Sequence, residues 1–289
     1  MTITEATTRT LEAPDATITY DVRPAGSTAH RPLFILGSPM AASGFQTLAG
    51  HFADRTVITY DPRGAERSTK VDPSGESTPE QHADDIHRVI EAVGLGPVDV
   101  FASSGGAVNS LALVAAHPDD VHTLVAHEPP LAGILPDSTN AQAAVRSVSN
   151  AYQAGGFGPG MAQFIVIVGH KGEFPDDIGQ RPAADPAMFG MPALDDGSRS
   201  DVLLAQNLFT CTHYQPDFDS LRSASTHIVV AAGVESEGEM ANRGAHAVAE
   251  KLGQEPVAFP SGHGGFLGGE YGQSGEPDAF AAKLHEVLD

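Results

Sequence analysis

The stretch Val98-Asp-Val-Phe-Ala-Ser-Ser-Gly-Gly-Ala-Val108 decides the fold of this chain. Its first half is an apolar run typical of a buried β-strand, and apolar residues at helical spacing follow it. A strand can turn directly into a helix only where the residues two before and two after the turn position are small. Ala102 and Gly106 meet that condition around Ser104. The stretch therefore predicts a strand, a sharp turn at Ser104 and a helix over 105–117.

Outside this stretch, short apolar runs alternate with longer amphipathic ones, which is the pattern of an α/β protein with a parallel sheet. One helix has clear ends, because Thr78 and Gln81 form a capping-box pattern around Pro79 and Gly94 stops the periodicity. Another helix is expected over 277–288. We expect a mostly parallel eight-stranded sheet flanked by helices, with an antiparallel pair at one edge. The expected strands are 8–12, 16–22, 33–36, 56–60, 98–102, 123–126, 228–232 and 257–259.

The regular alternation breaks between about residues 131 and 216. This region contains two Gly/Pro-rich stretches, one of them 155–160, and helical patterns around 141–154 and 202–211. We expect a core interrupted by a helical insertion that forms a lid over one end of the sheet; a surface excursion without function is the alternative. The expected division is core 1–132, insertion 133–217 and core 218–289.

Composition limits the classes of function. The chain has 289 residues, with 37 acidic and 16 basic side chains and a net charge of −21. This length suits one sizeable domain. So few Lys and Arg cannot form the basic face that nucleic acid or an anionic membrane requires, so we expect neither as a partner. The single cysteine, Cys211, excludes an intramolecular disulfide and a cysteine-based zinc cluster.

Targeting and cofactor signals are not found in the sequence. No basic segment with a following apolar stretch occurs near Met1, and the apolar runs are too short to cross a bilayer. We therefore expect a soluble cytoplasmic protein, either a monomer or a homodimer. The sequence has no His-Glu-x-x-His motif and no glycine-rich dinucleotide fingerprint, so we expect neither a metal nor an organic cofactor.

Taken together, these features resemble the α/β-hydrolase superfamily, over nearly the whole chain. The resemblance implies that Ser104 is the nucleophile, held at a helix N-terminus where backbone N–H groups favour developing negative charge. A phosphate-binding loop is the alternative for this turn. The last expected strand is followed by Phe259-Pro-Ser-Gly-His-Gly-Gly-Phe266, where the family carries its general base. That residue would be His263.

The stretch Leu33-Phe-Ile-Leu-Gly-Ser-Pro-Met40 looks like the family's strand and loop that complete the oxyanion hole. The family often has His-Gly there, and this chain has Leu-Gly. The hole would consist of the N–H of Gly105 and that of Ser38, or alternatively of Met40, because Pro39 has no N–H. In the turn that follows the next strand, Tyr60 to Ser68, Asp61 and Arg63 are expected to have structural roles.

Two positions are open for the acid of a catalytic triad. The commonest family position, after strand 228–232, is Ser236 in this chain, with Glu235 and Glu237 on either side. Another branch of the family places the acid at the end of the strand that follows the nucleophile helix, where this chain has Glu128 before two prolines. We favour Glu128 over Glu235.

The resemblance implies a serine hydrolase that needs no cofactor. Serine at the nucleophile position argues against dehalogenation and epoxide hydrolysis, which use a carboxylate there. The apolar residues of the insertion favour a fairly hydrophobic, uncharged ester or lactone as substrate. Amide cleavage, carbon–carbon bond cleavage and perhydrolase or haloperoxidase-type chemistry use the same triad and stay open. A member of the fold that binds a small molecule without catalysis is the competing class.

Overall fold

The computed structural model describes residues 5–25 and 30–289. Its centre is a nine-stranded sheet with strand order β1-β2-β4-β3-β6-β7-β8-β9, and β5 pairs with β2. Strands β3, β4 and β6 to β9 pair in parallel, whereas β1, β2 and β5 pair antiparallel at one edge. The strands are β1 Thr7–Ala13, β2 Ala16–Arg23, β3 Leu33–Leu36, β4 Val57–Tyr60, β5 Thr69–Lys70, β6 Val98–Ser103, β7 Val121–His127, β8 His227–Gly233 and β9 Val257–Phe259.

The predicted fold class is confirmed, but the predicted count of eight strands is wrong by one. The additional strand is β5, whose two residues pair with Ala16 and Thr17 of β2. A strand of two residues cannot show an apolar alternation, so its presence depends on the neighbouring strand and not on a local pattern. The antiparallel edge pair is confirmed, with Thr7 opposite Val22 and Ala13 opposite Ala16.

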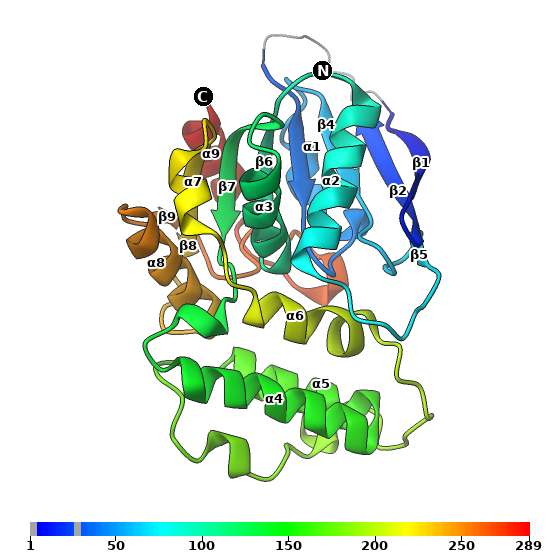
Figure 1. The fold of residues 1–289 in the computed structure, drawn as a ribbon, viewed down its shortest axis with the longest axis vertical. Coiled ribbons are helices and arrows are strands. Elements are labelled where there is room, and N and C mark those ends of the chain that lie inside the picture. The colour runs from blue at the N-terminus through cyan, green and yellow to red at the C-terminus, as the bar shows by residue number, and fades with distance from the viewer. Residues whose placement is uncertain (1–4, 26–29) are drawn as a thin grey trace.

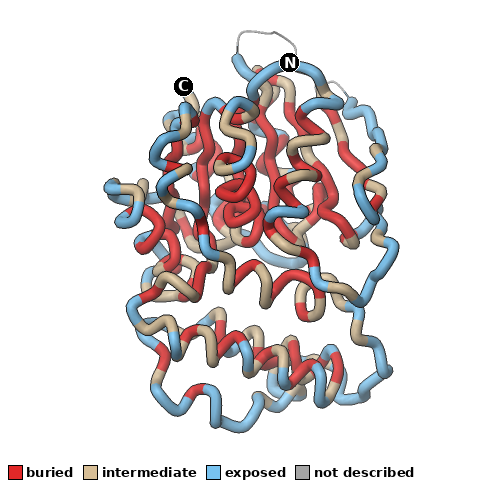
Figure 2. The backbone as a smooth tube through the Cα atoms, in the orientation of Figure 1, coloured by how far each residue is buried: buried red, intermediate tan, exposed pale blue. Residues whose placement is uncertain are grey.

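Helices cover both faces of the sheet (Figure 1). Apolar side chains of α2, α3, α7 and α8 pack on one face, and those of α1 and α9 pack on the other. The central strands β3 and β6 are wholly buried, whereas β1, the first strand of the sheet order, is mostly exposed (Figure 2). The helices are α1 Gln46–Gly50, α2 Pro79–Val93, α3 Gly105–Ala116, α4 Ser138–Gly155, α5 Phe157–Val168, α6 Leu208–His213, α7 Phe218–Ser223, α8 Met240–Leu252 and α9 Pro277–Leu288.

The ends of α2 follow from its sequence. The Thr78 hydroxyl accepts the N–H of Gln81, the Gln81 side chain accepts the N–H of Thr78, and Pro79 occupies the first helical position. Gly94 ends the helix with φ of 67°, a conformation that glycine adopts without a steric penalty. The prediction of this helix is confirmed.

The chain from α4 to α6, between β7 and β8, forms a helical layer beyond the carboxyl ends of the parallel strands (Figure 1). Helices α4 and α5 pack together and share an apolar cluster with Met240 and Ala247 of α8. Helix α5 begins at Phe157, inside a Gly/Pro-rich stretch, because Pro159 lies in its first turn where no N–H is needed. A π-helical turn, Val202–Asn207, precedes α6. Among the described residues, no helix is both long and apolar enough to cross a bilayer.

Candidate functional site

Ser104 forms the sharp turn that the sequence predicts. Strand β6 ends at Ser103 and α3 begins at Gly105, so Ser104 alone connects them, with φ of 57° and ψ of −127°. Such a conformation is strained for a residue with a side chain and persists only where its surroundings enforce it. Here the N–H of Ser104 donates to the carbonyl of His127 at 2.9 Å, which fixes the turn against the end of β7.

The small residues at the turn admit the neighbouring loop after β3. A Cβ atom on Gly106 would lie 2.7 Å from the Cα of Gly37, and one on Gly105 would lie 2.5 Å from the carbonyl oxygen of Ser38. The same position on Gly105 is 3.3 Å from Sγ of Cys211, so α6 also approaches the turn. The structure therefore brings the predicted oxyanion-hole segments, Gly105 and the loop at Ser38, into contact.

The buried side chain of Asp61 supports this loop. It accepts the N–H of Ala42 at 3.1 Å and the N–H of Arg67 at 3.1 Å. Arg63 instead donates two hydrogen bonds of 2.7 Å to Asp85 on α2, and both side chains are buried. Both residues thus have structural contacts: Asp61 holds the turn itself, and Arg63 ties the turn to α2.

Glu128 and His263 form a short polar contact in the site. Nδ1 of His263 lies 2.6 Å from Oε2 of Glu128, which is entirely buried. Glu128 follows β7 directly with φ of 49°, and its N–H donates to Ala231 of β8 at 3.0 Å. The N–H of Ser104 bonds to the carbonyl of His127, the residue before Glu128. The turn and the Glu128–His263 pair therefore lie together at the carboxyl ends of β6 and β7.

The other carboxylate oxygen of Glu128 is held by donors from the β8 end of the sheet. Oε1 accepts the N–H of Gly233 at 2.9 Å, the hydroxyl of Ser236 and the side-chain amide of Asn242 at 3.1 Å. Burial raises the pKa of this carboxyl, but the hydrogen bonds with His263 and Ser236 outweigh it and lower the pKa to about 2. Glu128 is therefore ionised at neutral pH and can stabilise a positive charge on His263.

Glu235 has a different environment. Its Oε2 accepts the hydroxyl of Ser261 at 3.0 Å, and its N–H donates to the carbonyl of Ser261. The residue at the family's commonest acid position, Ser236, turns toward Glu128. Of the two candidate acids, the structure pairs Glu128 with His263.

Sequence reasoning did not identify His127, Ser236 and Asn242 as parts of the site. His127 is buried, and burial lowers its pKa to about 4, so its ring is neutral. Its ring stacks at 5.9 Å on that of His263, and its Nδ1 lies 3.1 Å from the Ser103 hydroxyl. Ser236 carried a usable signal, because a hydroxyl at the usual acid position can bind a carboxylate that comes from elsewhere. Asn242, in the middle of α8, carried none.

Comparison with known proteins supports the assignment of the fold. A family model described as the alpha/beta hydrolase fold matches residues 33–155. An uncharacterized hydrolase of Bacillus subtilis is 29% identical over 97% of this chain and 95% of its own length. The 2-(acetamidomethylene)succinate hydrolase of Mesorhizobium japonicum is 32% identical over 65% of this chain and 69% of its own length. A thermophilic esterase of Thermogutta terrifontis superposes with a TM-score of 0.66 over 98% of both chains at 18% identity.

The strand order, the parallel core and the sequence relatives all agree with one family. The esterase shares the fold at low identity, and the two relatives are hydrolases by name. This chain is a hydrolase of the α/β-hydrolase family.

Proposed function

We propose that this protein is a serine hydrolase that cleaves a carboxylic ester or lactone of a fairly hydrophobic small molecule. Ser104 is the nucleophile, His263 the general base and Glu128 the acid. The observation that carries the proposal is the 2.6 Å contact between His263 and the buried, ionised Glu128. This contact lies at the carboxyl ends of the strands, where Ser104 also lies.

The proposed order of events starts from the hydrogen bond between His263 and Glu128. His263 donates Nδ1–H to Glu128, which leaves Nε2 to accept the proton of the Ser104 hydroxyl as its oxygen attacks the carbonyl carbon. The resulting oxyanion accepts the N–H of Gly105 and that of Ser38 or Met40, each contact contributing about 3–4 kcal/mol in the transition state. His263 then gives its proton to the leaving alcohol, and water hydrolyses the acyl-enzyme in the same way.

The helical layer between β7 and β8 supports a substrate of low polarity. Cys211 on α6 approaches the turn at Gly105, which supports a role for this layer as a lid over the reacting group. Burial raises the pKa of the Cys211 thiol to about 12, and the side chain therefore acts as a small apolar wall. The esterase of the same fold is an example of this chemistry, and the fold by itself does not select it over the other reactions that the triad can perform.

The proposal is tested by labelling with a fluorophosphonate and by turnover of an ester and lactone panel. Intact mass should show one adduct, peptide mapping should place it on Ser104, and His263→Ala should prevent it. Ser104→Ala should lower kcat by about 10⁶. Ser103→Ala is the matched control, because Ser103 is the neighbouring serine and its hydroxyl bonds to His127 and not to the proposed triad. This variant should retain at least a tenth of the activity. Folded protein without adduct and without turnover would refute the proposal.

A further inference from the structure

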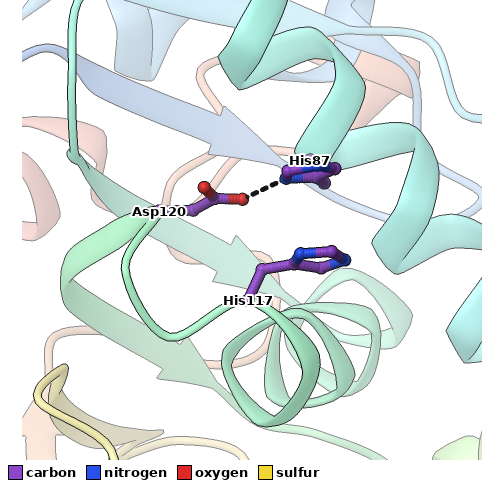
Figure 3. A group of neighbouring side chains, drawn as sticks. All are labelled: His87, His117 and Asp120. Carbon is purple, nitrogen blue, oxygen red and sulfur yellow. Dashed lines mark hydrogen bonds and ion pairs between the residues drawn. The ribbon is translucent and has the colours of Figure 1, made fainter.

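A second group of polar side chains lies away from the site described above, at the end of α3 (Figure 3). His87 comes from α2, His117 from the end of α3 and Asp120 from the turn before β7. Each residue offers one ligand atom, a ring nitrogen of each histidine and a carboxylate oxygen of Asp120. These three atoms lie within 4.8 Å of one another. All three side chains are partly buried, so they are held by packing and remain open to solvent.

The backbone holds these residues in place. The N–H of His117 donates to Leu113 at 2.7 Å as the last bond of α3, and the N–H of Asp120 donates to His117 at 3.1 Å. His87 lies inside α2, a helix capped at both ends. Two rigid elements and one hydrogen-bonded turn thus bring the three groups together, an arrangement that reduces the cost of ordering ligands around an ion.

The chemistry of the group matches the requirements of a metal ligand set. Nδ1 of His87 faces Oδ2 of Asp120 at 2.6 Å, while its Nε2 faces Oε2 of Glu91 at 3.4 Å. A carboxylate on the far nitrogen is the outer partner that fixes the tautomer of a metal-binding histidine. The rings of His87 and His117 stack at a centroid separation of 3.8 Å and an angle of 8°, so the two imidazoles lie side by side.

We propose that His87, His117 and Asp120 bind one divalent ion of the borderline class, with Zn²⁺ as the reference ion. Two imidazoles and one carboxylate are typical ligands of such ions, and water supplies the fourth position. Because the rings are parallel, one imidazole turns about its Cβ–Cγ bond on binding, a torsion with broad minima. The hydrogen on Nδ1 of His87 moves to Nε2, where Glu91 accepts it, and the ion takes its former place beside Asp120.

The bound ion would join α2 to the end of α3. The experiment is a calorimetric titration of chelator-treated protein with ZnCl₂, with Co²⁺ absorption as a second probe. We expect one equivalent of Zn²⁺ that persists in His263→Ala, which excludes the triad histidine as its ligand. The melting temperature should rise with the zinc concentration.

Variants locate the ion. His117→Gln should weaken binding by at least about tenfold, and His117→Ala combined with Asp120→Asn should abolish it. His122→Gln is the matched control, because His122 lies two residues beyond Asp120 with its side chain 53% exposed, and it should bind as the wild type does. If circular dichroism shows that the double variant does not fold, the zinc affinity of His117→Gln is the deciding measurement. Zinc binding that is absent from the wild type, or unchanged in His117→Gln, would overturn the proposal.

Discussion

Two histidine–carboxylate pairs in the described part of the chain have the same contact distance and different surroundings. Glu128 meets His263 at 2.6 Å, and Asp120 meets His87 at 2.6 Å. Glu128 is entirely buried and its second oxygen is held by Gly233, Ser236 and Asn242, whereas the Asp120 side chain is 18% exposed. The comparison shows that two contacts of equal length can differ in burial and in the number of donors that hold the second carboxylate oxygen.

Of the changes at these two pairs, the largest effect should come from removing the charge of the buried pair. Glu128→Gln keeps the shape of the side chain but cannot stabilise a protonated His263, so kcat should fall by about 10⁴. The measurement is kcat on the best substrate of the ester panel. Glu235→Gln is the matched control and should change kcat less than twofold. Equal losses in the two variants would contradict the assignment of the acid.

The buried pair should also control stability in acid. The pKa of Glu128 is about 2 in the folded protein against an ordinary value of 4.5, so its contribution is present above pH 4.5 and is lost as the pH falls toward 2. The shift corresponds to about 3 kcal/mol of unfolding free energy. Urea unfolding between pH 7 and pH 2.5 measures it. A slope against pH that is the same in Glu128→Gln and the wild type would rule this contribution out.

A smaller effect should follow from loosening the hydrogen bonds around Glu128. Ser236→Ala removes one donor to Oε1, so the carboxylate is less stabilised and holds His263 less well; kcat/KM should fall about tenfold, in line with a hydrogen bond to a charged group. Ser236→Thr keeps the hydroxyl and should restore most of the activity. The pH profile of kcat/KM separates this positioning role from a loss of fold. A kcat/KM in Ser236→Ala as high as that in Ser236→Thr would disprove the role.

The smallest effects are expected at the second pair. Asp120→Asn removes a partly exposed contact of His87, so the free energy of unfolding should change by less than about 1 kcal/mol in the absence of metal. Its kcat should stay within twofold of the wild type. A loss of activity comparable to that in Glu128→Gln would mean that the two regions are coupled and that the comparison fails.

Much of the fold and part of the site could be predicted because their signals are local. The capping box at Thr78, the small residues around Ser104 and the glycine-rich loop at His263 each lie within a few residues of one another. The choice between Glu128 and Glu235 stayed open, because it depends on where the ends of β7 and β8 lie relative to the loop that carries His263. The structure pairs Glu128 with His263 across 135 positions of sequence.

The sequence by itself determined the α/β alternation, the sharp turn at Ser104 and the two ends of α2, because backbone geometry and hydrophobic periodicity act over short distances. Only the tertiary structure decided which donors surround Glu128, that β5 pairs with β2, and that His87 meets Asp120 from 33 positions away. These contacts depend on the register and packing of whole elements. No local pattern encodes them, and they form only when the sheet and its helices are assembled.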